Sequence, residues 1–136
     1  MKLNPAAIIV SAIVYWLLGG LWFGMIFSKP WMALEGMTAA RAEQMNPIIP
    51  YIIAFATGLI LAYVLASVCL WRQVDSASKG ASLGVLLWIG FVATTTLACY
   101  QFEGRPFHLF LINFGYCLVG MTIMGAILGA WKKQAA

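Results

Sequence analysis

The sequence predicts an all-α membrane protein: four transmembrane helices in a bundle packed through small residues, plus one short interfacial helical segment. Three observations predict this class. Apolar residues make up 63% of the 136 residues and charged residues only 9%, which excludes a soluble domain. Four apolar runs, at residues 5–27, 47–71, 79–101 and 106–131, each exceed the roughly 20 residues needed to cross about 30 Å of hydrocarbon. Backbone polar groups cannot stay unpaired in lipid, so runs this long and continuous are helices.

The first predicted helix, residues 5–27, begins where Asn4 supplies a cap and Pro5 occupies the first helical position. The run is too long for the core of a signal peptide, so we interpret it as a retained helix. Residues 29–45 follow it, and we expect one or two short helices that lie in the interface, with Trp31 at headgroup depth. This segment is either a passive anchor or a functional lid.

The other three predicted helices have comparable signals at their ends. Residues 47–71 follow Asn46 and a proline, which repeats the start of the first helix. Residues 79–101 are expected to be capped by one of three polar residues, Asp75, Ser76 or Ser78. Residues 106–131 follow a short turn and end at two lysines. We expect the whole chain, residues 1–136, to form a single transmembrane domain.

Basic residues flank the predicted helices unequally. One membrane face has Lys2, Arg72, Lys79, Lys132 and Lys133, and the other has Lys29, Arg41 and Arg105. Because cytoplasmic loops carry the excess of Lys and Arg, we expect both termini in the cytoplasm. The net charge of +4 comes from these flanking residues, which indicates contact with the lipid bilayer and not with nucleic acid.

Small residues recur at four-residue spacing on all four predicted helices, and such residues let helix backbones approach closely in lipid. They are Gly20 and Gly24 on the first helix, Ala54, Gly58, Ala62 and Ala66 on the second, Gly80 and Gly84 on the third, and Gly125 and Gly129 on the fourth. These stripes pack helices within one chain or between copies. Because they are so numerous, we expect a homo-oligomer or a subunit of a larger membrane assembly.

The densest polar group lies at the start of the fourth helix. Glu103, Arg105 and His108 occupy the turn, and Asn113 lies deeper in the apolar run. We expect Arg105 to pair with Glu103, and Asn113 to bond across to the threonines at 94–96, with Thr95 as the central candidate. Histidine changes its charge near neutral pH, so the group is either a satisfied turn or a substrate or proton site.

Trp16 and Trp88 lie near the middles of the first and third helices, where an indole N–H needs a partner. They either fill space between helices or line a site for an apolar ligand such as a lipid or pigment. We expect no other cofactor and no metal. The chain has a single histidine, and its three cysteines all lie within apolar runs: Cys69, Cys99 and Cys117.

Several short motifs carry a resemblance to a known family. They are Asn4-Pro5, Gly20-x-Trp22-Phe23-Gly24, Lys29-Pro30-Trp31-Met32, Trp88-x-Gly90-Phe91 and Phe102-Glu103-Gly104-Arg105-Pro106. The chain resembles, over almost its whole length, the small bacterial membrane proteins of the domain of unknown function 1761 family. The resemblance implies a bacterial inner-membrane protein with about four helices. It implies no reaction, ligand or catalytic residue.

The functional expectation follows from the scarcity of chemically competent polar groups beside many packing motifs. We expect an integral membrane structural or accessory protein, oligomeric and without catalytic activity. The alternative is a small transporter, channel or ligand-binding membrane protein that uses the polar group at the start of the fourth helix. A water-filled cavity reaching Asn113 would favour this alternative.

Overall fold

The computed structural model describes residues 2–131, and four of its helices are long and apolar enough to cross a membrane. The first comprises α1 (Pro5–Leu21) and a π-helical turn, η1 (Trp22–Ile26), and the second is α4 (Ile49–Trp71). The third joins α5 (Ala77–Leu87), a π-helical turn η2 (Trp88–Ala93) and α6 (Thr94–Glu103), and the fourth is α7 (Phe107–Ala130). Two short helices, α2 (Ser28–Glu35) and α3 (Ala39–Gln44), lie between the first two. The predicted all-α class with four apolar helices is confirmed.

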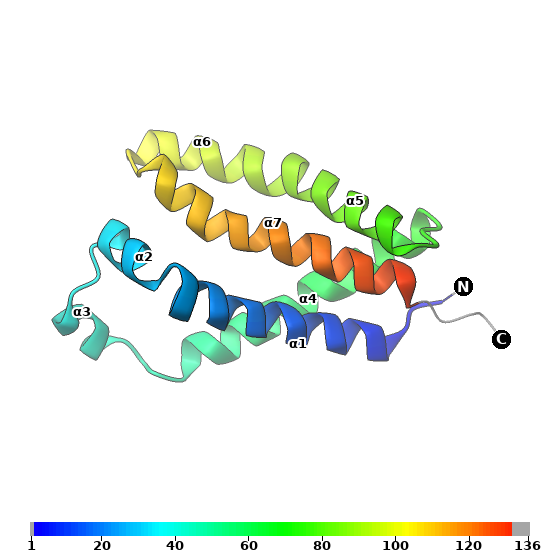
Figure 1. Ribbon diagram of the computed structural model, residues 1–136, viewed down its shortest axis with the longest axis horizontal. Coiled ribbons are helices and arrows are strands. Elements are labelled where there is room, and N and C mark those ends of the chain that lie inside the picture. Colours follow the sequence, from blue (N-terminus) through cyan, green and yellow to red (C-terminus); the bar gives the residue numbers. More distant parts are fainter. Residues whose placement is uncertain (1, 132–136) are drawn as a thin grey trace.

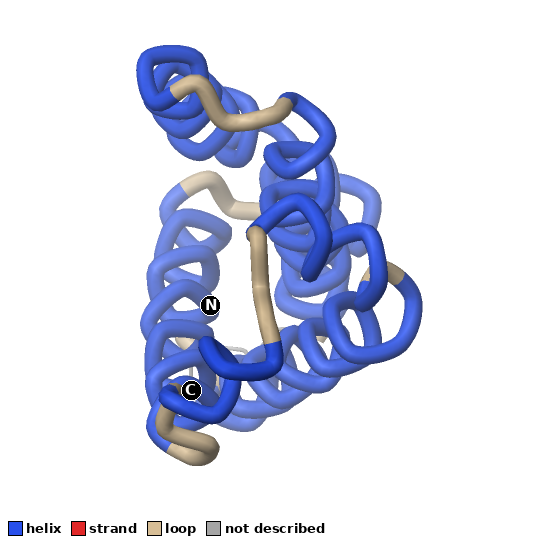
Figure 2. Tube along the Cα trace, turned by 90° about the vertical axis from the view of Figure 1, so that its left-hand side faces the viewer, coloured by secondary structure: helices blue, strands red, loops and turns tan. Residues whose placement is uncertain are grey.

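The four long helices run side by side, with α7 at the centre of the bundle in contact with α1, α4 and α5 (Figures 1 and 2). The start of the described chain, the end of α7 and the α4–α5 turn lie at one end of the bundle (Figure 1). At the opposite end lie α2, α3 and the α6–α7 turn (Figure 1). This second end holds most of the predicted polar residues.

Side-chain hydrogen bonds mark the starts of three of the four long helices, α1, α4 and α5. The side-chain oxygen of Asn4 accepts hydrogen bonds from the backbone N–H groups of the next helical turn, as expected. The Asn46 side-chain oxygen accepts from the Ile48 N–H at 2.8 Å and from the Ile49 N–H at 2.9 Å, and α4 begins at Ile49 rather than at the predicted residue 47. Of the three candidate caps for α5, Ser76 accepts from the Lys79 N–H at 3.3 Å.

Glycines bring α5 and α7 into backbone contact. A Cβ atom added at Gly80 would overlap the carbonyl oxygen of Gly125, and one added at Gly84 would overlap the carbonyl oxygen of Met121. A Cβ atom at Gly129 would likewise overlap the carbonyl oxygen of Ser76 on the turn before α5. Close approach of this kind maximises van der Waals contact between helices that gain nothing from the hydrophobic effect in lipid. These two glycine pairs therefore pack helices within the chain.

The remaining small residues divide between the inside and the outside of the bundle. On α4, a Cβ atom added at Gly58 would lie 3.5 Å from the Tyr15 ring of α1. The two alanines that follow at four-residue spacing, Ala62 and Ala66, are buried. Ala54, the fourth residue of the predicted stripe, is exposed. Gly20 and Gly24 have nothing within 4 Å of an added Cβ. The predicted stripes on α1 and at Ala54 thus face outward.

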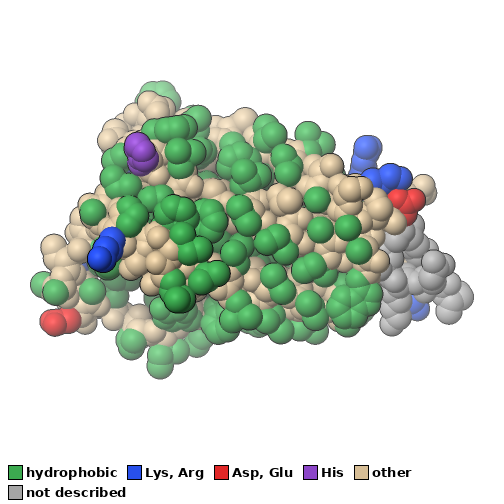
Figure 3. Space-filling view, viewed as in Figure 1, with side chains coloured by type: hydrophobic (Ala, Val, Ile, Leu, Met, Phe, Trp, Pro, Cys, Tyr) green, Lys and Arg blue, Asp and Glu red, His purple; other side chains and the backbone are tan. Residues whose placement is uncertain are grey.

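The outer surface of the bundle is apolar along its length. Figure 3 shows hydrophobic side chains over the body of the molecule and charged side chains at its two ends. Large apolar residues on different helices point outward, for example Phe91, which is 73% exposed, and Ile60, which is 64% exposed. Of the basic residues counted for orientation, Lys132 and Lys133 lie outside the described residues.

Candidate functional site

A cluster of five polar and aromatic side chains joins α2 to the α6–α7 hairpin. It consists of Trp31 and Glu35 on α2, Tyr100 on α6, Arg105 in the turn and Asn113 on α7, and is called here the Asn113 cluster. The Asn113 Oδ1 accepts from the Trp31 Nε1 at 2.9 Å, and the Asn113 Nδ2 donates to the Tyr100 hydroxyl at 2.9 Å. The same Nδ2 lies 3.5 Å from the Glu35 Oε1. The amide therefore bridges three elements.

Two glycines position the charged members of the cluster. Gly36 and Gly104 have φ values of 69° and 68° and end α2 and α6 in the left-handed conformation that favours glycine. The ends bring Glu35 and Arg105 together, and the Arg105 Nη2 donates to the Glu35 Oε1 at 2.9 Å. The Arg105 guanidinium carbon also lies 4.5 Å from the Tyr100 ring centroid. This stacking holds the guanidinium over an aromatic face.

The Glu35–Arg105 pair is partly withdrawn from solvent, since the two side chains are 20% and 34% exposed. An ion pair in this position interacts more strongly than a fully exposed pair, and its loss leaves a charge that solvent reaches only in part. The pair therefore ties α2 to the α6–α7 turn.

Of the predicted polar residues, Arg105 and Asn113 belong to the Asn113 cluster, and Glu103 forms the expected ion pair with Arg105 at a longer distance. Glu103 is exposed, and its Oε2 lies 4.0 Å from the Arg105 Nη1, so Glu35 rather than Glu103 is the closer partner. The His108 side chain is exposed and has no hydrogen bond or ion pair with any residue in the described range 2–131. Arg105 and Asn113 thus belong to a site, and His108 lies outside it.

The expectation that threonines of α6 bond to Asn113 is wrong. The Thr95 hydroxyl donates to the carbonyl oxygen of Phe91 at 2.7 Å, on its own helix. Thr94 and Thr96 likewise donate to the carbonyls four residues earlier. Threonine in a helix commonly satisfies its hydroxyl in this way. Tyr100, one turn further along, supplies the oxygen that Asn113 uses instead.

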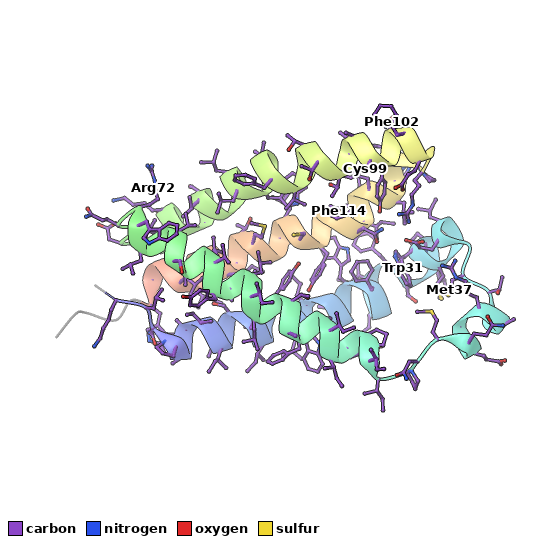
Figure 4. All side chains as sticks on the ribbon, turned by 180° about the vertical axis from the view of Figure 1, so that it is seen from behind. Trp31, Met37, Arg72, Cys99, Phe102 and Phe114 are labelled. Atoms are coloured by element: carbon purple, nitrogen blue, oxygen red, sulfur yellow. The ribbon has the colours of Figure 1, made fainter. Side chains whose placement is uncertain are left out.

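Three tryptophans donate to three consecutive residues of α7. The Trp22 Nε1 donates to the Ile112 carbonyl at 2.9 Å, Trp31 donates to the Asn113 side chain, and the Trp88 Nε1 donates to the Phe114 carbonyl at 2.9 Å. Figure 4 shows Trp31 and Phe114 near each other at this end. Trp22 and Trp88 are also the first residues of η1 and η2. Both π-helical turns therefore begin at a residue anchored to the same turn of α7.

The two tryptophans that are candidates either to fill space or to line an apolar ligand site contact different helices. The Trp16 Nε1 donates to the Tyr51 carbonyl at 3.1 Å, and its ring packs edge-on against Phe55 with centroids 5.8 Å apart. Both partners belong to α4, whereas Trp88 donates to α7. Each indole N–H is satisfied by a carbonyl oxygen of a neighbouring helix.

The comparisons with known proteins identify the family. The model described as "Protein of unknown function (DUF1761)" matches residues 6–129. The chain belongs to the DUF1761 family. No curated protein and no solved structure matches it. The resemblance found in the sequence is confirmed, and the match covers the four long helices except for the first residue of α1 and the last residue of α7, together with the whole Asn113 cluster of this DUF1761 protein.

Sequence reasoning missed three members of the cluster in the DUF1761 chain, Trp31, Glu35 and Tyr100. A usable signal was present on α2, because Trp31 and Glu35 are four residues apart and so share one helical face. That spacing does not reveal which helix the face meets. Tyr100 lies 13 residues before Asn113 across the hairpin turn, and its hydroxyl needs a partner when the ring is buried.

Two openings in the DUF1761 bundle lie away from the Asn113 cluster. A small one of about 30 Å³ lies between Lys2, Cys69 and Trp131, and a groove of about 470 Å³ follows the α4–α5 turn. Neither is lined by a member of the cluster. Within residues 2–131, no three His, Cys, Asp or Glu side chains gather as a metal site would require, and the three cysteines are free thiols.

Proposed function

We propose that this chain is a bacterial inner-membrane protein that crosses the bilayer four times and serves as a non-catalytic structural or accessory component. The apolar outer surface between two charged ends carries the proposal. Leaving a side chain such as Phe91 or Ile60 exposed to water costs about 1.5–3 kcal/mol relative to burying it in an apolar environment. Apolar exposure on this scale is rare on soluble monomers and normal for surfaces that face lipid.

The bonding of the Asn113 cluster supports a structural role. Both atoms of the Asn113 amide have partners, and the Arg105 guanidinium is held by Glu35 and by the Tyr100 ring. Polar groups that are already satisfied within the protein specify packing and have little capacity left for a substrate. The cluster would fix α2 and the α6–α7 turn against α7, at the end where the bundle meets water.

The outward-facing small residues support assembly with further subunits. Gly20, Gly24 and Ala54 are exposed in the single chain, so they would let a neighbouring helix approach closely. The orientation with both termini in the cytoplasm rests on Lys132 and Lys133. Without them, each face has three basic residues in the part of the chain that the structure describes.

Fractionation of cells that express the full chain tests the proposal. We expect the protein in the membrane fraction after washing with alkaline carbonate and in solution only with detergent. A reporter fused to the C-terminus should be active in the cytoplasm, and native mass spectrometry in mild detergent should detect more than one copy. Recovery in the soluble fraction would overturn the membrane proposal, and a strictly monomeric mass would overturn only the assembly.

The second candidate, a small transporter or channel, is favoured by the π-helical turns. η1 and η2 interrupt two of the four long helices, and both begin at tryptophans anchored beside Asn113. Such turns are frequent at functional sites. In this reading the Glu35–Arg105 pair is a gate that separates when a substrate passes.

An ion-flux measurement distinguishes the two candidates. Under the structural proposal, proteoliposomes containing the wild-type chain or Glu35→Gln should release trapped protons or potassium no faster than protein-free vesicles. The matched control is Glu43→Gln, which removes the same charge from an exposed position on α3. A flux at least tenfold above background in Glu35→Gln, with Glu43→Gln at the wild-type level, would replace the structural role with a gated pathway.

A further inference from the structure

The groove along the α4–α5 turn is amphipathic. Its volume is about 470 Å³, within the range of roughly 300–1,000 Å³ typical of small-molecule sites. The lining residues are Arg72, Gln73, Val74, Ser78, Lys79, Ser82, Leu83 and Leu86. They come from the α4–α5 turn and from the three turns of α5. Figure 4 labels Arg72 at this end of the bundle, opposite to Trp31.

The outer part of the groove carries positive charge. The Arg72 side chain has no hydrogen bond or ion pair with any other residue in the range 2–131, so its guanidinium can bind a further group. The Lys79 Nζ lies 2.8 Å from the Asp75 Oδ1, but both side chains are exposed, and such pairs contribute little and exchange readily. Ser82 donates to the Ser78 carbonyl at 2.9 Å and is already satisfied. Arg72 and Lys79 are therefore the groups able to bind an anion.

The inner part of the groove is apolar. Val74 and Leu83 form a buried floor, and Leu86 is 63% exposed beyond them. Lys79 and Leu86 are two turns apart, which corresponds to about 10 Å along the helix at 1.5 Å per residue. The headgroup layer of one leaflet is roughly 5–8 Å thick. A helix that places Lys79 at the phosphates therefore places Leu86 in hydrocarbon.

We propose that this groove binds an anionic phospholipid, with the phosphate on Arg72 and Lys79 and one acyl chain along Leu83 and Leu86. The inference rests on the proposed insertion into a bilayer. Charge complementarity favours an anionic ligand. The groove has two basic side chains, Arg72 and Lys79, beside a single carboxylate, Asp75, and so carries a net positive charge. A guanidinium binds phosphate through parallel N–H donors, and each basic residue near the membrane surface attracts anionic lipid by about 1 kcal/mol.

Native mass spectrometry of the detergent-purified full chain tests the site. Phosphatidylglycerol and phosphatidylcholine with the same acyl chains are added separately, and retained lipid adducts are counted. We expect phosphatidylglycerol to be retained preferentially by the wild-type chain. The Arg72→Gln/Lys79→Gln variant should lose affinity about fivefold for each basic residue removed, as about 1 kcal/mol per charge implies.

The matched control is Lys29→Gln/Arg41→Gln, which removes the same charge at the opposite end and should retain phosphatidylglycerol at the wild-type level. Equal loss in the control, equal retention of phosphatidylcholine, or dimers in place of lipid adducts would each overturn the lipid site. If the double variant does not fold, the exposed single variant Arg72→Gln decides the same question. A chain that is absent from membranes altogether would instead contradict the proposed function.

Discussion

Replacing Gly84 with alanine is expected to lower the free energy of unfolding in detergent by about 2–3 kcal/mol, at the upper end for overpacking. The added Cβ atom would overlap the carbonyl oxygen and carbon of Met121 on α7. Backbone atoms of a helix cannot swing aside as a flexible side chain does, so α5 and α7 would have to separate. Separation would remove the contact of α5 with α7 at Gly80 and Gly125 as well.

Gly20→Ala is the matched control, because an added Cβ there meets nothing within 4 Å. Both variants make the same chemical change in a long apolar helix, and only Gly84 lies against another backbone. Thermal unfolding of the purified proteins followed by circular dichroism compares them. We expect Gly20→Ala to unfold within about 0.5 kcal/mol of the wild-type chain. A similar loss in both variants would show that backbone approach at Gly84 does not set the effect, because replacing glycine with alanine raises helix propensity and cannot itself destabilise the helix.

Most of the fold was predictable because crossing a bilayer demands a length and a composition that few other structures need. The four apolar runs were long enough to predict the four long helices, and a cap residue such as Asn4 marked where a helix begins. The partner of each small-residue stripe was not predictable. Gly80 and Gly20 have the same four-residue signature, but one faces α7 and the other faces outward. The signature encodes how closely a helix can approach, not which helix does so.

The π-helical turns also escaped prediction, because their apolar residues suit an uninterrupted α-helix equally well. What distinguishes η1 and η2 is the anchoring of Trp22 and Trp88 to α7, a tertiary contact. The Asn113 cluster was predictable only in part, because most of its contacts are also tertiary. Asn113 was conspicuous because an amide within an apolar run needs partners. Its link to Glu35, which lies 78 residues earlier, depends on how α2 folds back onto α7.

Replacing Asn113 with leucine is expected to lower the free energy of unfolding by about 1–3 kcal/mol. The substitution leaves the Trp31 N–H without its acceptor and the Tyr100 oxygen without its donor, both in a partly buried setting. An unsatisfied buried polar group costs about 1–3 kcal/mol, whereas interhelical hydrogen bonds in membranes average nearer 0.6 kcal/mol. Two groups lose their partners, but water can replace a lost partner at this end of the bundle, so the expected total stays within about 1–3 kcal/mol.

A double-variant cycle with Trp31→Phe separates the hydrogen bond from simple packing. If the bond at 2.9 Å carries the effect, the double variant should lose at least 0.5 kcal/mol less than the sum of the single variants. Thr95→Val is the control, because its hydroxyl is satisfied by its own helix and its side chain faces outward. Strict additivity in the cycle, or an equal loss in Thr95→Val, would mean that Asn113 fills space without joining α2 to α7. Within residues 2–131, the ion pair between Glu35 and Arg105 would then be the shortest polar contact that still joins α2 to the hairpin.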